Sequence, residues 1–229
     1  MSIDAVDQRW DGFLTQIRGR FDQIMQESIA GCMGLYQQSG EILPLGNAWG
    51  AMRIRGMQLG TKVQDTWDDK VSETYDDAGA TAAQEDAARR RGEDLQDYIE
   101  TELVRVETKI YCDIARSLLG KAQAEQAEIK CTQCGAQLDH HFSLRSVNLT
   151  CSACGAVNTV VPGTATGHYS GMVHHLCNEA AWDAWLAMHA AERAYGDART
   201  ANLELLQRYE GATIEFWTQY LRKRIELDS

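Results

Sequence analysis

The chain is poor in the residues and segments that break helices, cross membranes or direct secretion. Its 229 residues include only two prolines, Pro44 and Pro162, while alanine, glutamine, glutamate, arginine and leucine are abundant, which is typical of a helical protein. No apolar run approaches the length that spans a bilayer, and the first residues lack the basic start and apolar core of a secretory signal. We therefore expect a mainly α protein without a membrane span.

Positive charge is also scarce, since the formal net charge is −11. This balance argues against general affinity for nucleic acid or for an acidic membrane surface. The seven cysteines are an odd number, and Cys32, Cys112 and Cys177 are scattered singly in segments of helical character. A disulfide scaffold is therefore not expected, and the reducing cytoplasm is the predicted location.

What the chain does contain is a pair of Cys-x-x-Cys motifs, Cys131 with Cys134 and Cys151 with Cys154, separated by sixteen residues. Each motif can close a tight turn around one ion, and the spacer is long enough for a hairpin that brings the motifs together. A glycine follows each motif, which permits the left-handed backbone that points amide N–H groups at the sulfurs. The spacing predicts one structural Zn²⁺ held by these four thiolates. An iron–sulfur cluster or a redox dithiol pair is the alternative.

Residues 130–163, which read Lys-Cys-Thr-Gln-Cys-Gly and later Leu-Thr-Cys-Ser-Ala-Cys-Gly-Ala-Val, resemble a zinc ribbon. The resemblance covers about a seventh of the chain. It implies a small β fold with a structural metal. It implies no single function, because zinc ribbons occur in many proteins of unrelated function.

Outside this segment, apolar residues recur every three or four positions, which predicts helices. The expected helices cover about 3–38, 46–77, 82–128, a stretch that starts near 167, and about 198–227. Ser39, Gly40 and Pro44 predict a linker, and Ala78-Gly79-Ala80 predicts a turn. Whether 167–227 forms one helix or two stays open, since Gly196-Asp197 suits either a turn or a kink.

These elements predict an elongated multi-helix bundle of residues 1–129 and 164–229, with a small β zinc ribbon, 130–163, inserted between helices three and four. Candidate strands of the ribbon are 137–143, 147–150 and 156–161. The ends of the ribbon come together once both motifs share an ion, so the flanking helices are expected to pack antiparallel. Heptad character is imperfect, which favours a globular bundle over a pure coiled coil.

Two features predict how the second and third helices pack. The first half of helix 46–77 is rich in glycine, with Gly46, Gly50, Gly56 and Gly60. These glycines favour the close approach of a neighbouring helix. They do not indicate a phosphate-binding loop, because no Gly-Lys-Ser/Thr follows them. A fold-back at Gly79 would also place Asp68 and Asp69 beside Arg89–Arg91.

The histidines form a second candidate constellation, with Cys177 nearby: His168, His174, His175 and His189. A ligand or metal sensor built on the His168–His175 region is one hypothesis, and Cys177 with His174 suggests a nucleophile. No His-Glu-x-x-His or Glu-x-x-His motif accompanies them, so ordinary structural histidines are expected instead. The six tryptophans are expected to share an aromatic core layer rather than a ligand pocket.

The sequence thus favours a non-enzymatic zinc-binding scaffold or adaptor, whose ribbon and exposed helix faces dock protein partners or a second copy. The alternative is a nucleic-acid-associated regulator that uses the ribbon and Arg89–Arg91. The charged side chains of the ribbon are only Lys130, Asp139 and Arg145, which argues against that alternative. Arg222-Lys223-Arg224 is also not expected to bind phosphates. These cations lie in the last turns of a helix, where they interact favourably with the helix dipole.

Overall fold

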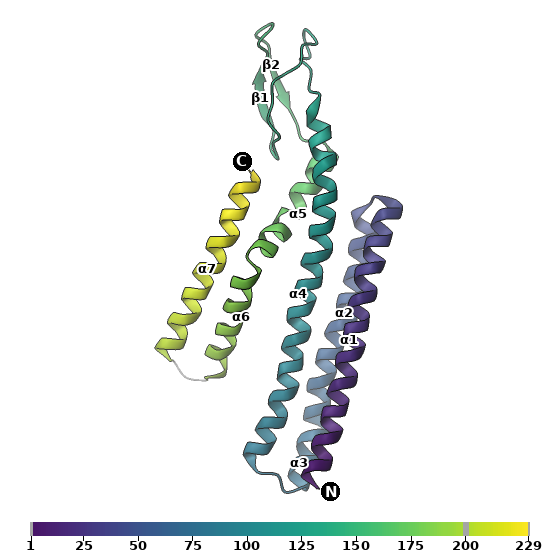
Figure 1. The fold of residues 1–229 in the computed structure, drawn as a ribbon, viewed down its shortest axis with the longest axis vertical. Coiled ribbons are helices and arrows are strands. Elements are labelled where there is room, and N and C mark those ends of the chain that lie inside the picture. The colour runs from purple at the N-terminus through teal and green to yellow at the C-terminus, as the bar shows by residue number, and fades with distance from the viewer. Residues whose placement is uncertain (1, 199–201, 229) are drawn as a thin grey trace. The chain divides into compact units, whose positions relative to one another are not determined.

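The structure, a computed structural model, describes residues 2–198 and 202–228 and is mainly helical, as expected. A small two-stranded sheet interrupts the helices between α4 and α5 (Figure 1). In chain order the elements are α1 Ile3–Ser39, α2 Ile42–Thr66, the π-helix η1 Trp67–Val71, α3 Ser72–Asp77, α4 Ala82–Ala127, β1 Val147–Thr150, β2 Val157–Val160, α5 Thr164–Ala180, α6 Trp182–Asp197 and α7 Leu203–Asp228. None of the described helices combines the length and apolar character needed to cross a membrane.

The chain divides into two compact units, residues 1–110 and 111–229, and the boundary falls inside α4. The β insertion belongs wholly to the second unit. The expected division into a bundle of 1–129 with 164–229 and a ribbon of 130–163 stays a prediction.

The first unit is built from α1, α2 with η1 and α3, and the first part of α4, which run side by side (Figure 1). Each contributes one apolar stripe to the core, as the periodicity predicts. The buried residues include Val6, Trp10, Leu14, Ile17, Phe21 and Met25 of α1, Trp49 and Val63 of α2, and Leu95, Ile99, Leu103 and Val106 of α4. The indole N–H of Trp10 donates to the carbonyl of Ala88 at 2.9 Å, so this buried ring leaves no polar atom unsatisfied.

The predicted helix 46–77 is helical throughout, but it begins earlier and changes pitch. Since α2 begins at Ile42, Pro44 lies in its first turn, and the expected linker at Pro44 is wrong. Proline fits there because the first N–H groups of a helix have no helical acceptor. The π-helix η1 then carries the chain into α3 and buries Trp67, whose ring centroid lies 5.6 Å from that of Trp10.

The turn at Gly79 is confirmed, with φ of 75°, but the expected pairing of Asp68 and Asp69 with the arginines is wrong. Arg89 instead pairs with Asp86 and Glu93 of its own helix. Arg91 pairs with Asp7 and Asp11 of α1. Distance from the turn sets the level of a residue along a hairpin. The phase of each helix sets the direction of its side chain, and Arg91 points to α1.

The second unit contains the end of α4, the β insertion and helices α5, α6 and α7. The segment 167–227 therefore contains more than two helices: Ala181 separates α5 from α6, and α6 ends at Asp197. The connection at 199–201 lies outside the described residues. Buried Phe216 of α7 packs with Ala181 and Ala184, and Trp185, Met188 and Tyr220 surround this cluster.

The two helices that flank the insertion pack antiparallel, as expected. Residues near the end of α4 contact residues near the start of α5. Residues farther back in α4 contact residues farther along α5. The pairs are Gln126 with Thr166, Arg116 with Glu179, and Tyr111 with His175.

The tryptophans do not form one shared layer. Trp10 and Trp67 belong to the first unit, whereas Trp182 stacks on Trp185 in the second at a centroid distance of 4.8 Å. Trp217 is 49% exposed. The expectation of a single aromatic core therefore fails because the chain has two separate cores.

Close approach at the glycines of α2 is confirmed for Gly56, and this generates a prediction. A Cβ at Gly56 would lie 3.0 Å from Cδ2 of Leu103 and 3.1 Å from Cε2 of Phe21, whereas one at Gly50 would meet no atom within 4 Å. We expect Gly56→Val to lower the free energy of unfolding by about 1–3 kcal/mol through overpacking. The matched change Gly50→Val should cause no such loss. Urea denaturation followed by circular dichroism measures both, and equal effects would contradict this packing.

Candidate metal centre

The two Cys-x-x-Cys motifs fold into two copies of one tight turn. In the first, the N–H of Cys131 donates to the carbonyl of Ala136 at 2.8 Å, and Gly135 N–H donates back to Cys131 at 2.9 Å. Cys151, Gly155 and Ala156 repeat the same two bonds at the same distances. Gly135 and Gly155 adopt φ of 74° and 76°, the left-handed conformation expected from the sequence.

The hairpin between the motifs brings the four sulfurs to one place. Strands β1 and β2 pair antiparallel, with Val147 opposite Val160 and Thr150 opposite Val157. The Sγ atoms of Cys131, Cys134, Cys151 and Cys154 all lie within 4.8 Å of one another. Cys131 lies 3.6 Å from Cys154, and Cys134 lies 3.6 Å from Cys151, so these are separate thiols rather than disulfides.

The sulfur positions fit a single tetrahedral ion. Thiolates bonded to one Zn²⁺ at about 2.3 Å would lie about 3.8 Å apart, close to the spacing found here. An iron–sulfur cluster with several irons would hold its cysteines farther apart, because iron and sulfide lie between them. The four residues would together fill the coordination shell of one ion and leave no position for water.

Backbone amides favour the thiolate form of the two buried cysteines of the motifs, Cys131 and Cys151, which is the form that binds a cation. The N–H groups of Cys134 and Gln133 point at Cys131 and lower the pKa of its thiol to about 6. The N–H groups of Cys154 and Ala153 likewise lower the pKa of Cys151. The Ala156 amide lowers the pKa of Cys154, but the neighbouring thiols and burial outweigh it and raise that pKa to about 12. Without a metal, therefore, the group does not hold four negative charges, and a cation would release the remaining protons.

Asn158 joins the two motifs and was not singled out from the sequence. Its side chain is buried, and its Oδ1 accepts the N–H of Thr132 at 2.9 Å and the Thr132 hydroxyl at 3.0 Å. Its Nδ2 donates to Sγ of Cys131 at 3.6 Å and to the carbonyl of Ala156 at 3.1 Å. One amide on β2 thus orients a ligand of the first motif and the backbone of the second. In the sequence this residue is only an asparagine within the predicted strand 156–161, and nothing there marks its role.

Two consecutive residues at the end of α4, Glu125 and Gln126, anchor the insertion at its base. Glu125 accepts the N–H groups of Ala165 and Thr166 at 2.8 and 3.0 Å, so it caps the start of α5. These bonds lower the pKa of its carboxyl group. Gln126 donates to the carbonyl of Ser143 and accepts the Ser143 N–H, at 2.8 and 2.9 Å.

The Gln126 contacts explain a correction to the predicted strands. Strand 147–150 is confirmed and 156–161 shortens to Val157–Val160, but 137–143 forms no strand. Only Gln137 makes an isolated bridge, to Lys130. The following loop is held by the side chain of Gln126 instead, which also lies 2.9 Å from Nε2 of His140. His141 stays exposed.

The structure does not assemble the other histidines into a metal site. Within the described residues, the four cysteines are the only group of three or more potential ligands that converge. His168 and His174 are exposed, and His189 packs on Trp185 with ring centroids 4.6 Å apart. His175 is buried between His174 and Tyr111, with centroid distances of 3.8 and 4.5 Å.

Cys177 does not have the surroundings of a nucleophile. It is fully buried, and burial raises the pKa of its thiol. A reactive cysteine needs an exposed, electropositive site that stabilises the thiolate.

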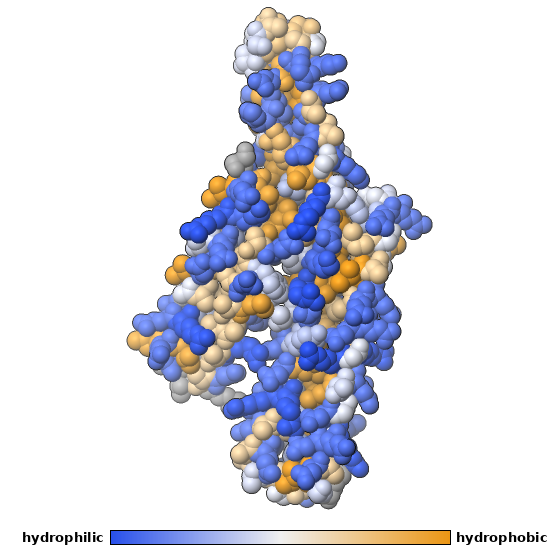
Figure 2. All heavy atoms as spheres, in the orientation of Figure 1, coloured by the Kyte–Doolittle hydropathy of each residue, from blue (hydrophilic) through white to orange (hydrophobic). Residues whose placement is uncertain are grey.

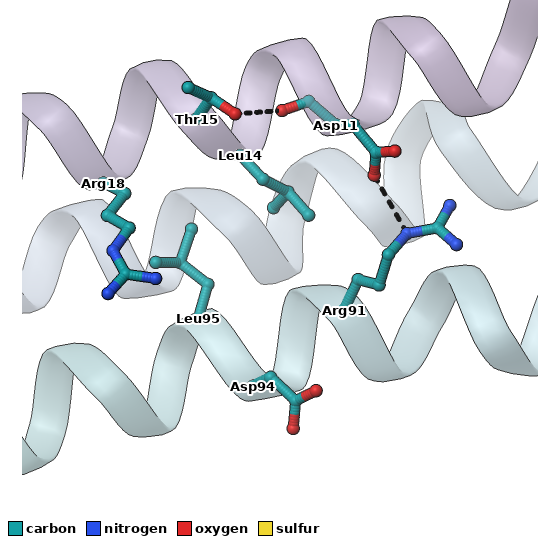
Figure 3. Close-up of a pocket in the computed structure, with 7 residues that line it drawn as sticks. All are labelled: Asp11, Leu14, Thr15, Arg18, Arg91, Asp94 and Leu95. Carbon is teal, nitrogen blue, oxygen red and sulfur yellow. Dashed lines mark hydrogen bonds and ion pairs between the residues drawn. The ribbon is translucent and has the colours of Figure 1, made fainter.

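A hollow of about 370 Å³ lies between α1 and α4 in the first unit (Figure 3). Arg91 crosses it to Asp11, with Nε 2.9 Å from Oδ1, and Arg18 lies 4.1 Å above the ring of Tyr98. Both cations are thus engaged by the protein itself. The hollow therefore offers no convergent free groups of the kind that define a ligand site.

Comparison with protein-family models, with curated proteins and with solved structures found no match to the chain.

The contacts of Asn158 predict that it strengthens metal binding without being a ligand. We expect Asn158→Ala to weaken zinc affinity about 10–100-fold, because Cys131 loses its orienting donor and the two turns lose their link. Competition with a chromogenic zinc chelator measures this. Asn148→Ala on the exposed side of β1 is the matched control and should bind like the wild type. Equal affinity of the two variants would contradict the role of Asn158.

His175 predicts a pH dependence of stability. Burial, with repulsion from His174, lowers its pKa to about 4, and its buried Nδ1 has no hydrogen-bond partner among the described residues. The folded pKa lies below the unfolded value of about 6.5, so this contribution is complete above about pH 6.5 and falls as the pH drops towards 4. Between about pH 7 and 5 we expect the wild type to lose about 2 kcal/mol more than His175→Phe. Urea denaturation at both pH values tests this, with His141→Phe as the exposed control. A wild type that parallels His175→Phe would refute it.

Proposed function

We propose that this protein is a non-enzymatic scaffold or adaptor in which a zinc-stabilised ribbon docks a protein partner. The ribbon comprises residues 130–163, and its ligands are Cys131, Cys134, Cys151 and Cys154. Four converging thiols suit a structural site, because a fourth protein ligand takes the position that catalytic zinc gives to water. We assign zinc because closed sites of four thiolates are typical of structural zinc, and the metal content of the purified chain separates it from a single iron ion, which accepts the same ligands.

The ion would supply the stability that the ribbon lacks. Its own apolar cluster is small, with Leu138 buried beside Cys131 and Cys151. A segment of this size buries too little apolar surface to fold alone. Metal binding and folding of the ribbon are therefore expected to be coupled.

The observation that carries the proposal is the exposed face of the β hairpin. The strand register places Thr150 opposite Val157 and Asn148 opposite Thr159, so these four side chains share one face, and all are exposed. Val157 is 68% exposed, and Val161 beyond the strand is 69% exposed. The face is uncharged and largely β-branched, which suits contact with a protein surface and offers nothing to a phosphate.

The nucleic-acid alternative has less support. Arg89 and Arg91 are both held by carboxylates, which reduces the charge available to phosphates. On the ribbon, the two cations Lys130 and Arg145 meet Asp139, four thiolates and one divalent ion, so the formal charge of the segment is −1.

All seven cysteines are free thiols in the structure, which supports a reducing compartment such as the cytoplasm.

A zinc assay with a matched pair of variants tests the proposal. We expect about one zinc per purified chain and an X-ray absorption spectrum with four sulfur neighbours. Cys151→Ser should lose most of the zinc and the order of the ribbon, while circular dichroism retains most of the helical signal. Unchanged zinc content in Cys151→Ser, or an oxygen neighbour on the wild-type ion, would refute the assignment.

The docking role needs a variant that keeps the metal. Val157→Asp changes the exposed face but no ligand and no buried residue, so zinc content should stay normal. Quantitative affinity capture from the native host should then lose the same proteins with Val157→Asp as with Cys151→Ser. Gln16→Asp, an equal charge change at an exposed position of α1 far along the chain from the ribbon, is the control. If Val157→Asp retains every protein that the wild type captures, the face is not the docking surface. Binding of DNA or RNA at low salt by the wild type would favour the alternative instead.

A further inference from the structure

Helix α7 has two apolar faces, and the fold of the second unit covers only one of them. Phe216 and Tyr220 pack towards α6. A second stripe follows the helical repeat about a third of a turn around the helix, and its Trp217 borders the first face, with ring centroids 5.1 Å from Phe216 and 5.4 Å from Tyr220. This stripe consists of Ile214, Trp217, Leu221 and Ile225. These residues are 67, 49, 52 and 68% exposed, and Figure 2 shows hydrophobic surface along this side of α7.

We propose that this stripe pairs with the same stripe of a second copy, with the two α7 helices antiparallel. Four large apolar side chains in one continuous row are uncommon on a monomer surface, and a surface that meets its own copy about a two-fold axis must be self-complementary. The stripe meets that requirement both in its apolar residues and in its charges.

The charges decide the partner and its direction. Glu215 and Arg222 lie on the same flank of the stripe, seven residues apart, and both are exposed. Among the described residues Arg222 has no ion-pair partner, although its neighbours Lys223 and Arg224 pair with Glu226 and Asp228. In antiparallel helix pairs, a flank meets the same flank of the other helix. Glu215 of each copy therefore faces Arg222 of the other, twice. In a parallel pair the flank would meet the opposite one, and this match would be lost.

The apolar residues agree with the same register. Placing Glu215 against Arg222 sets Trp217 close to Leu221 of the second copy and Ile214 close to Ile225. In an antiparallel pair, the midpoint in sequence between two facing residues marks the two-fold axis. For all three pairings this midpoint lies within one residue of Gln219. The paired stretch is only about 16 Å long, so it buries less than a standard interface. The association should therefore be reversible, with Kd on the order of micromolar.

Analytical ultracentrifugation of the full chain from about 1 to 200 µM tests the association. We expect a monomer–dimer equilibrium for the wild type and for Cys151→Ser, since the stripe does not involve the metal. Leu221→Asp should abolish the dimer while leaving the circular dichroism unchanged. A wild type that stays monomeric throughout, or a dimer that survives Leu221→Asp, would overturn the proposal.

A charge swap tests the antiparallel register. Arg222→Glu should weaken the dimer about tenfold, because two attractions become repulsions, and Glu215→Arg should do the same. The double variant Glu215→Arg with Arg222→Glu should restore wild-type affinity. Arg208→Glu, the same change two turns before the paired stretch, is the control and should have little effect. Failure of the double variant to recover would reject this pairing.

Photo-crosslinking distinguishes the remaining arrangements. A benzophenone amino acid at position 225, in a mixture of ¹⁴N- and ¹⁵N-labelled protein, should link between copies to the tryptic peptide 209–222. A link to the C-terminal peptide 225–229 of the other copy would indicate a parallel pair. A link within one chain to residues 1–110 would indicate that the chain covers its own stripe. Either result would overturn the proposal.

Discussion

The fold of the second unit depends on the contacts that hold the two ends of the β insertion together between α4 and α5. It leaves α4 at Ala127 and re-enters a helix at Thr164, beside the residues that it left. Glu125 and Gln126 close this junction, the first by capping α5 and the second by holding both the ribbon loop and Thr166. At the far end the four sulfurs meet within 4.8 Å. The contacts at the helix junction and the convergence of the sulfurs both confine residues 128–163. Forming one therefore lowers the conformational entropy that is lost when the other forms.

The features of the second unit that the proposed function would use lie on its surface. When the protein supplies all four ligands, the ion organises a shape and activates nothing. Two exposed features of the second unit are an uncharged face of the ribbon and an apolar stripe on α7. They differ in chemistry, since the ribbon face is small and β-branched while the stripe is long, bulky and flanked by both charges. One chain thus exposes two surfaces of different chemistry, which are the two surfaces that the proposed adaptor role would use.

Charge in this protein is organised locally despite the net value of −11. Arg89 and Arg91 of α4 are held by carboxylates of α4 itself and of α1, and Arg116 of α4 is held by Glu179 of α5. Exposed ion pairs of this type add little stability but help to select how helices align. Cationic clusters in the sequence therefore say little about nucleic acid until their partners are known. Arg222 differs, because no carboxylate among the described residues pairs with it, and the proposed dimer would supply Glu215 of the second copy.

The sequence by itself determined the helices of the first unit, the antiparallel flanks of the ribbon and the four cysteines, because helical periodicity and Cys-x-x-Cys-Gly turns are local properties of a few residues. It did not determine that Pro44 opens a helix, that Arg91 reaches Asp7, or that 137–143 is held by Gln126 instead of forming a strand. Nor did it distinguish Asn158 from any other strand residue. These features were decided by the tertiary structure, since each joins side chains far apart in sequence whose directions depend on the phase of packed helices and the register of paired strands.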